Sequence, residues 1–195
     1  MFILASASPR RKELLENMGC EFSIRVSDAE EVSEGLSPEE TALYNARSKA
    51  LAVAGECPEL PVLGADTVVA MDGVIYGKPK DELHAMEMLR KLSGRSHNVL
   101  TAIVFVKGGQ VFSWVETTEV RFAGMTDEEI KAYVATGEPM DKAGAYAIQG
   151  RAEAWVEGIY GSWSNVVGLP LYRLRVLAGK AGIDLYGDNG EGSAR

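Results

Sequence analysis

Apolar residues recur along this chain in two patterns, and each pattern predicts one kind of element. A continuous apolar run, such as 62–71 or 99–106, predicts a strand that is buried on both faces. Apolar residues spaced three and four apart behind a capping residue predict amphipathic helices. The predicted strands cover residues 2–5, 22–26, 62–71, 74–76, 99–106, 110–123 and 154–160. The predicted helices follow Ser8, Ser37, Asp81, Thr126 and the loop 161–170.

The run 62–71 contains a single carboxylate, Asp66, among apolar and β-branched residues, and Asp72-Gly73 closes it with a turn signal. An ionised carboxylate loses several kcal/mol of hydration in such a strand. It is retained there when a metal ion, a cation or a hydrogen-bond network compensates the loss. The alternative is that Asp66 ends the strand and caps the following turn.

Two arginines occupy the first turn of the first predicted helix. Ser8 is a good N-cap and Pro9 a good first residue, so Arg10 and Arg11 lie at the positive end of the helix dipole. Cations are disfavoured there by about 0.3–1 kcal/mol each. The placement is explained if an anion binds at this end, held by free N–H groups, Ser hydroxyls and guanidinium groups. Otherwise both arginines are solvated on a helix surface.

Two lysines lie beside predicted buried structure. Lys49 shares a helix face with a stripe of small residues, namely Ala42, Ala46, Ala50 and Val53. It therefore either extends past the edge of the helix into solvent or reaches a buried anion. Lys78 follows the hairpin strand 74–76 and is expected in a loop beside the strand of Asp66.

Composition narrows the class of protein. The 195 residues carry a net charge of −8, with 46% hydrophobic and 25% charged residues, as in a soluble globular protein. The negative charge argues against a nucleic-acid or membrane-surface binder, but not against a small anionic ligand. No apolar run reaches transmembrane length, and the N-terminus lacks the features of a signal peptide. We expect one domain over residues 1–186 and a flexible tail over 187–195.

The cysteines and histidines do not form a recognisable metal site. Cys20 and Cys57 provide neither a disulfide framework nor a metal-ligand spacing, which fits a reduced cytosolic setting. His97 stands alone at the entry to a strand, where a structural hydrogen bond is expected, and His84 is expected on a helix surface.

Several short motifs occur in the order seen in Maf-like proteins, and the chain resembles this family from about residue 3 to about residue 180. Any one motif is weak, but the ordered set is specific. The motifs are Ser6-Ala7-Ser8-Pro9-Arg10-Arg11, Gly64-Ala65-Asp66-Thr67, Gly77-Lys78-Pro79, Ser93-Gly94-Arg95, Gly137-Glu138-Pro139, Asp141-Lys142-Ala143-Gly144-Ala145-Tyr146, Ile148-Gln149-Gly150 and Asn165-Val166-Val167-Gly168-Leu169-Pro170.

The resemblance implies an α/β fold, with a mixed twisted sheet, flanking helices and two lobes around an active-site cleft. It also implies a cytoplasmic nucleoside triphosphate pyrophosphatase, which converts a triphosphate into the monophosphate and pyrophosphate with a divalent metal cation such as Mg²⁺, Mn²⁺ or Co²⁺. No Walker-A pattern is present, so a P-loop enzyme is not expected. The implied partner is the nucleoside triphosphate, with no nucleic acid and no membrane, and a homodimer is one alternative for the oligomeric state.

The resemblance assigns roles to single residues. Asp66 corresponds to the catalytic proton acceptor, and whether it acts on the water directly or through the metal stays open. Glu31, with Glu30 beside it, corresponds to an acidic position that helps to hold the metal together with Asp66. The substrate-binding positions of the phosphate cleft are Ser8, Arg11, Lys49 and Lys78.

At three specificity positions the chain resembles the branch of the family that acts on dTTP and UTP. These positions are Arg10, Thr67 and Gln149. Thr67 directly follows Asp66, so in a strand their side chains point to opposite faces. Thr67 is therefore expected to reach a base only if the strand twists or ends there. The alternatives are the branch that prefers 7-methyl-GTP and a nucleotide-binding regulator of septum formation that does not hydrolyse its ligand.

Overall fold

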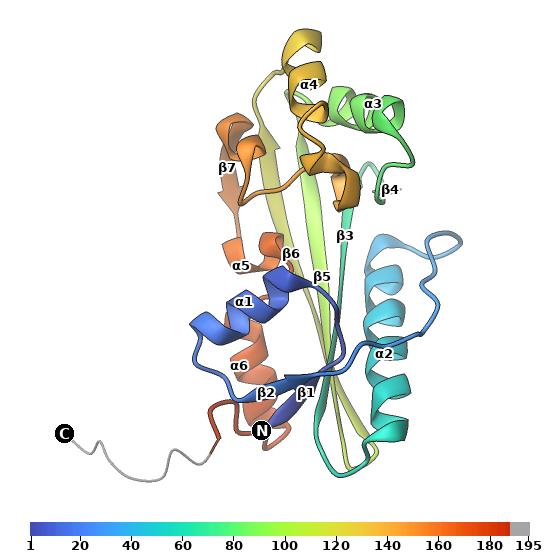
Figure 1. Ribbon diagram of the computed structural model, residues 1–195, viewed down its shortest axis with the longest axis vertical. Coiled ribbons are helices and arrows are strands. Elements are labelled where there is room, and N and C mark those ends of the chain that lie inside the picture. The colour runs from blue at the N-terminus through green and yellow to red at the C-terminus, as the bar shows by residue number, and fades with distance from the viewer. Residues whose placement is uncertain (188–195) are drawn as a thin grey trace, which may run out of the picture.

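The computed structural model describes residues 1–187, in which a long twisted sheet carries one group of helices near each end (Figure 1). The sheet has seven strands in the order β2-β1-β3-β5-β6-β7, and β4 pairs with β3 outside this path. β1 pairs in parallel with β2 and β3, whereas the other pairings are antiparallel. The mixed sheet is thus confirmed. Its strands are β1 (Phe2–Leu4), β2 (Phe22–Ile24), β3 (Val62–Met71), β4 (Val74–Tyr76), β5 (Ser96–Lys107), β6 (Gln110–Phe122) and β7 (Val156–Tyr160).

The helices begin at the predicted capping residues. Ser37 and Thr126 each form a complete capping box, with Glu40 and Glu129 respectively, and Asp81 accepts a hydrogen bond from the backbone of His84. Ser8 precedes the first helix as predicted, but its side chain makes no capping hydrogen bond. The helices are α1 (Pro9–Asn17), α2 (Pro38–Glu56), α3 (Glu82–Leu92), α4 (Asp127–Val134), α5 (Trp163–Val167) and α6 (Leu171–Lys180).

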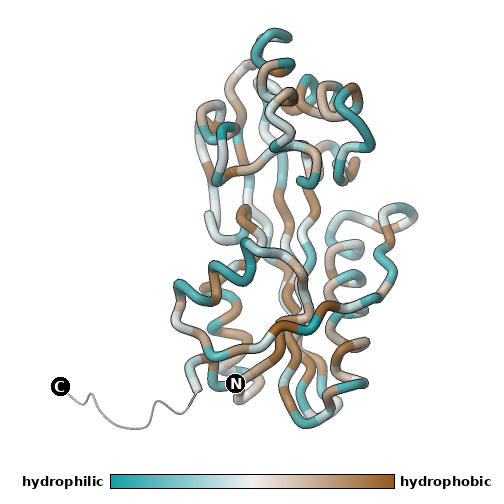
Figure 2. The backbone as a smooth tube through the Cα atoms, viewed as in Figure 1, coloured by the Kyte–Doolittle hydropathy of each residue, from teal (hydrophilic) through white to brown (hydrophobic). Residues whose placement is uncertain are grey.

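β3 is buried on both faces, as its apolar sequence predicts, because helices cover both sides of it. Its even-numbered residues pack with the alanine stripe of α2, and its odd-numbered residues pack in the core formed with α1, α3, α4 and α6. α2 lies very close to the strand, since a Cβ atom on Gly64 would be 2.2 Å from the carbonyl oxygen of Ala46. Figure 2 shows the hydrophobic residues gathered along β1 and the neighbouring long strands.

The structure departs from the sequence prediction in the C-terminal third. The segment expected to be a loop, 161–170, contains α5, because Ser162 caps it and Asn165 is fully buried with its amide donating to Val99 and Thr118. Strand β7 begins two residues later than predicted, since a 3-10 helix, Arg151–Trp155, precedes it. Two further 3-10 helices cover Glu138–Asp141 and Ala143–Ala145.

A gap in the neighbours of β3 divides the molecule into two lobes. The pairs with β1 end at Leu63, and the pairs with β4 begin at Val69. Between them, residues 64–68 have only β5 beside them, so this edge of the strand is uncovered. α1, α2 and α6 lie on one side of the gap and α3 and α4 on the other (Figure 1). The two predicted lobes are therefore joined by the long strands of one sheet.

The sequence also predicts a C-terminal tail and the lack of a transmembrane segment. The predicted tail 187–195 lies outside the described residues except for Gly187. Among the helices of residues 1–187, none has the length and apolar character that a membrane span requires.

Candidate active site

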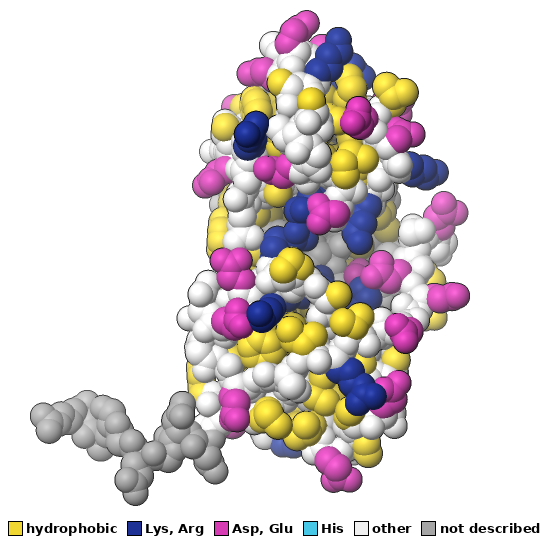
Figure 3. All heavy atoms as spheres, in the orientation of Figure 1, with side chains coloured by type: hydrophobic (Ala, Val, Ile, Leu, Met, Phe, Trp, Pro, Cys, Tyr) yellow, Lys and Arg dark blue, Asp and Glu magenta, His cyan; other side chains and the backbone are white. Residues whose placement is uncertain are grey.

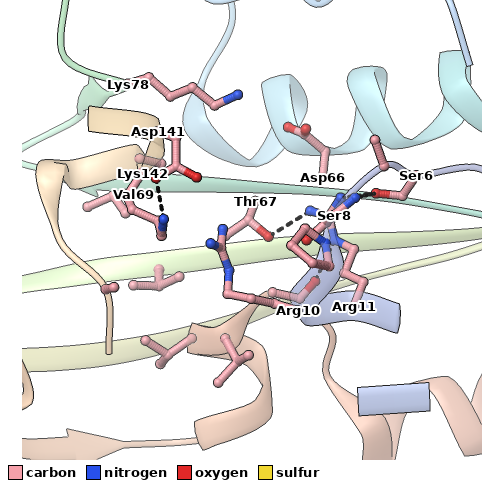
Figure 4. Close-up of a pocket in the computed structure, with 18 of the residues that line it drawn as sticks. Ser6, Ser8, Arg10, Arg11, Asp66, Thr67, Val69, Lys78, Asp141 and Lys142 are labelled. Carbon is pink, nitrogen blue, oxygen red and sulfur yellow. Dashed lines mark hydrogen bonds and ion pairs between the residues drawn. The ribbon is translucent and has the colours of Figure 1, made fainter. Parts of the chain in front are cut away.

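A cavity of about 410 Å³ lies in the gap beside β3, within the usual size range of small-molecule sites. Both lobes line it, as the close-up in Figure 4 shows. The space-filling view shows Lys and Arg side chains together with Asp and Glu side chains in this hollow (Figure 3). All of the sequence-predicted site residues line it except Glu30, namely Ser8, Arg10, Arg11, Glu31, Lys49, Asp66, Thr67, Lys78 and Gln149.

Asp66 is buried in the middle of β3 and faces α2. Its Oδ1 lies 2.7 Å from Nζ of Lys49, and its Oδ2 accepts a hydrogen bond of 3.3 Å from Nδ2 of Asn45. β3 continues to Met71, so the alternative that Asp66 ends the strand and caps a turn is wrong. A cation and an amide donor instead compensate the lost hydration of the carboxylate.

Lys49 connects the two acidic candidates. Its Nζ lies 2.5 Å from Oε1 of Glu31 as well as 2.7 Å from Asp66, and its side chain is only 13% exposed. Of the two interpretations left open by the sequence, the structure therefore favours a lysine that reaches a buried anion. Partial burial raises the pKa of Glu31, but the hydrogen bond to Lys49 and the charges of Lys49, Lys78 and Arg11 outweigh it and hold the pKa below its usual value. Glu31 is thus an ionised carboxylate beside Asp66.

Arg11 is buried and fully oriented by the protein. Its Nε donates to the carbonyl oxygen of Gly168 (2.9 Å), Nη1 to Oγ of Ser6 (3.0 Å) and Nη2 to Oγ1 of Thr67 (3.1 Å). Burial lowers its pKa while the charge of Asp66 opposes that change, and arginine remains charged in proteins. A solvated surface arginine is therefore excluded for this position. The guanidinium has further N–H groups with which it can contact a ligand in the cavity.

The remaining cations of the cavity come from both lobes. Arg10 is half-buried at the start of α1, and Lys78 is exposed in the loop after β4. Lys142 lies on the same wall as Lys78 and across the cavity from Arg10, with a side chain only 16% exposed and ion-paired with Asp141. The hydrogen bond from Lys142, together with the charges of Lys142 and Arg10, lowers the pKa of Asp141. Arg10 and Asp141 thus attract one another across the cleft.

Thr67 reaches the cavity for a different reason from the one the sequence indicates. Its side chain is on the face of β3 opposite to Asp66, where Oγ1 accepts from Arg11 and lies 3.0 Å from Oγ1 of Thr101. The strand does not end there. Both faces of β3 contribute to one cavity because the edge over residues 64–68 is uncovered.

Gln149 is exposed at the opposite wall of the cavity, in a turn closed by the hydrogen bond from N of Gly150 to O of Ala147. Glu138 holds this turn, since its carboxylate accepts from Tyr133 Oη and from the backbone N of Arg151. The side-chain amide of Gln149 is therefore free to contact a ligand, while its backbone is fixed.

Four site residues were not assigned from the sequence, namely Ser6, Asn45, Asp141 and Lys142. Ser6 orients Arg11, and Asn45 contacts Asp66. The signal for Asn45 was its position four residues before Lys49, in line with the alanine stripe, where a polar residue needs a partner. Asp141 and Lys142 stood in a recognised motif, but nothing local placed that motif opposite α1.

The carboxylates suit a hard divalent cation. Mg²⁺ is usually held by one or two carboxylates together with substrate phosphates and retained waters. Glu31 and Asp66 lie on the two sides of Lys49 at the cavity wall, so this donor set fits the expected metal. Residues 1–187 contain no group of three or more His, Cys, Asp and Glu side chains that could hold a metal by protein ligands alone. A metal here would share its ligands with the substrate.

A family model described as Maf-like protein matches residues 1–181. The chain belongs to the Maf-like protein family. Curated relatives of this Maf-like chain named dTTP/UTP pyrophosphatase include a Geobacillus protein, 52% identical over 172 residues, and a Symbiobacterium thermophilum protein, 51% identical over 172 residues. These matches cover 88% of this chain and 92% and 89% of the two relatives. A Pelotomaculum thermopropionicum protein of the same name is 45% identical over 186 residues, which is 94% of this chain and 97% of that protein.

Among solved structures, the Maf-like chain is similar to the Staphylococcus aureus Ham1 protein, with a TM-score of 0.45 and 14% sequence identity. That match covers 92% of this chain and 98% of the other. The likeness is too distant to bear on the chemistry of the cleft.

Proposed function

We propose that this Maf-like protein is a nucleoside triphosphate pyrophosphatase that hydrolyses dTTP and UTP to the monophosphate and pyrophosphate. The observation that carries the proposal is the cavity in which a buried carboxylate, Asp66, is surrounded by cations from both lobes. The names of relatives about half identical to this chain over most of its length support the substrate pair.

The cations match the charge of the substrate. A nucleoside triphosphate carries close to four negative charges, and Arg and Lys side chains stabilise the charge of a transferring phosphoryl group. We assign the substrate-binding role to Arg11, Lys49 and Lys78 as the sequence predicted, and add Lys142, which lies on the same wall as Lys78. Ser8 contributes a hydroxyl group that does not cap α1, at the N-terminus of a helix whose free N–H groups favour anions.

Asp66 is the proposed catalytic residue. Its carboxylate orients the attacking water and accepts its proton as the new oxygen–phosphorus bond forms at the α-phosphorus. The bond from the α-phosphorus to the bridging oxygen breaks, and pyrophosphate leaves with that oxygen. Lys49 fixes one oxygen of the carboxylate, which keeps Asp66 oriented before the substrate binds.

Glu31 and Asp66 would hold a divalent cation, Mg²⁺, Mn²⁺ or Co²⁺, beside the Lys49 ammonium group. Such a cation supplies charge stabilisation at the phosphate oxygens.

Base choice is proposed to rest on Gln149, with Arg10 and Thr67. The side-chain amide of Gln149 has both a donor and an acceptor, which suits the O4 and N3–H edge of thymine and uracil. A site that hydrogen-bonds one edge discriminates against a base lacking it, because the polar groups that the bound base covers are then left unpaired.

A panel of nucleoside triphosphates tests the proposal. Purified protein is mixed with dTTP, UTP, CTP, dATP, dGTP and 7-methyl-GTP in the presence of Mg²⁺, Mn²⁺ or Co²⁺, and released pyrophosphate is measured. We expect dTTP and UTP to be hydrolysed fastest, and no hydrolysis without a divalent metal. Faster hydrolysis of 7-methyl-GTP would overturn the base assignment alone. Nucleotide binding without any pyrophosphate release would overturn the enzymatic assignment and favour a binding regulator.

A further inference from the structure

Asn45 makes three hydrogen bonds from a buried position on α2, four residues before Lys49. Its Oδ1 accepts from the backbone N of Val32 (2.9 Å), and its Nδ2 donates to the carbonyl oxygen of Val32 (3.0 Å). The same Nδ2 donates to Oδ2 of Asp66 (3.3 Å). The side chain is therefore bonded at once to the loop that carries Glu31 and to the candidate catalytic carboxylate.

The orientation of this amide is determined by its partners. If the oxygen and nitrogen were exchanged, the NH₂ group would face the N–H of Val32 and the carbonyl oxygen would face the carboxylate of Asp66. Both contacts would be repulsive. In the observed orientation both hydrogens of Nδ2 have an acceptor and Oδ1 has a donor, so neither end of the amide favours the exchanged orientation.

We propose that Asn45 is a positioning residue for the hydrolysis proposed above, which clamps the Glu31 loop to α2 and restrains the carboxylate of Asp66. The clamp follows from the hydrogen bonds alone. Its effect on catalysis rests on the proposed function.

The clamp is needed because the other link to this loop is weak. Glu31 contacts Lys49, but the Glu31 side chain is 56% exposed, and solvent screens an ion pair with an exposed partner. The pair of bonds to Val32 is buried at the Asn45 end, with Asn45 only 3% exposed. Glu31 directly precedes Val32 in the chain. Holding the backbone of Val32 therefore also holds the backbone from which the Glu31 side chain extends.

Hydrogen exchange in the absence of nucleotide and metal tests the clamp directly. We expect Asn45→Ala to accelerate exchange at the amide of Val32 and across residues 27–36, because the amide loses its acceptor. The matched control is Thr41→Val, one turn earlier on α2, where the hydroxyl is buried without a hydrogen-bond partner among the described residues. Unchanged exchange over 27–36 in Asn45→Ala would overturn the proposal.

Steady-state kinetics with dTTP tests the catalytic consequence. Asn45→Asp keeps the shape and the acceptor for Val32 N, but removes both donors and adds a negative charge beside Asp66. We expect kcat to fall about tenfold or more in Asn45→Asp and less in Asn45→Ala, with KM within about twofold, because like charges and misplacement act at the reacting group. Thr41→Val should leave kcat unchanged.

A merely structural role gives a different result. Both Asn45 variants would then lower the thermal midpoint, while kcat of the folded Asn45→Asp protein would equal that of the wild type, and this outcome would overturn the positioning role. If wild-type protein releases no pyrophosphate at all, the proposed function fails, and the exchange experiment still decides whether the clamp exists.

Discussion

At the scale of single residues, the cleft depends on charges that the protein orients before any substrate is bound. Each oxygen of the Asp66 carboxylate has its own partner, and each nitrogen of the Arg11 guanidinium donates to a different group. Preorganised charges of this kind need no reorientation during a reaction. Substitution of Asp66 and substitution of Arg11 leave different neighbouring groups without a partner. We therefore expect the two substitutions to affect activity and stability differently.

We expect Asp66→Asn to reduce kcat for dTTP by at least about a hundredfold, since a positioned acid–base group typically contributes this much. The substitution keeps the shape of the side chain, and Lys49 retains Glu31 as its partner, so the thermal midpoint should change little. The measurement is kcat together with a melting curve. The exposed Asp72→Asn, in the hairpin turn, is the control and should keep full activity. Wild-type turnover by Asp66→Asn would contradict the catalytic assignment.

Arg11→Ala is expected to reduce both stability and activity. The carbonyl of Gly168 would lose its donor, and a buried unsatisfied group costs about 1–3 kcal/mol, whereas the hydroxyls of Ser6 and Thr67 keep Ser8 N and Thr101 as partners. Denaturant unfolding measures the loss, with the exposed Lys12→Ala on the same helix as the control. A solvated arginine at the positive end of the dipole would instead give a slightly more stable variant.

At the scale of elements, the site depends on how closely α2 lies against β3. Lys49 and Asn45 reach Asp66 because only small residues separate the helix from the strand, with Ala46 and Ala50 facing Gly64. α2 thus brings the Lys49 ammonium group and the Asn45 amide to the middle of β3, a strand whose other residues are mostly apolar.

Gly64→Ala is expected to destabilise the fold by about 1–3 kcal/mol, as overpacking in a core usually does. The added Cβ would lie 2.2 Å from Ala46 O and 2.8 Å from the Cβ of Ala50, so α2 must move. That movement should also lower kcat, since it shifts Lys49 away from Asp66. Gly55→Ala is the matched control, because it lies near the end of α2 with open space around it, and a helical Gly to Ala change is stabilising by about 0.5–1 kcal/mol. Equal unfolding midpoints for the two variants would contradict the close packing.

At the scale of the whole molecule, the two lobes are joined by the sheet and by contacts between segments far apart in sequence. His97 of β5 is 2% exposed, and its Nε2 lies 2.8 Å from Oη of Tyr146, in the segment that leads to Gln149. Its ring also packs edge-on against Phe122 of β6. The expected structural hydrogen bond is confirmed, and it ties one wall of the cleft to the sheet.

Burial lowers the pKa of His97 from 6.5 to about 4, which makes stability depend on pH. In the unfolded chain the imidazole takes up a proton near pH 6.5, whereas the folded protein resists protonation down to about pH 4. Stability is therefore intact above pH 6.5 and is lost as the pH falls toward 4, by about 3 kcal/mol from this group.

We expect His97→Gln, which cannot titrate but can still bond Tyr146, to flatten the dependence of the unfolding free energy on pH between 6.5 and 4. Denaturant unfolding at a series of pH values measures it, with the half-exposed His84→Gln as the control. If the two variants and the wild type show the same slope, His97 is not the group responsible.

The sequence by itself determined most elements and the identity of most charged groups in the cleft. Capping boxes, the alanine stripe of α2 and the apolar run of β3 are local signals, because backbone satisfaction and hydrophobic periodicity act between near neighbours. The ordered motifs contain seven of the nine predicted residues that line the cavity, and the family resemblance supplied the other two, Glu31 and Lys49. α5 was missed since its cause is the burial of Asn165, a contact with Val99 and Thr118 across the chain.

Tertiary structure alone decided which of these groups meet and what each one contacts. Asp66 could have capped a turn, Lys49 could have extended into solvent, and Arg11 could have been a surface residue, because local sequence is compatible with each. The packing of α2 on β3 decided the first two, and contacts with Ser6, Thr67 and Gly168 decided the third. The uncovered edge of β3 then opens both faces of one strand to a single cavity. Such an edge arises from the registers of β1 and β4, which are set by long-range packing, and no window of neighbouring residues contains that information.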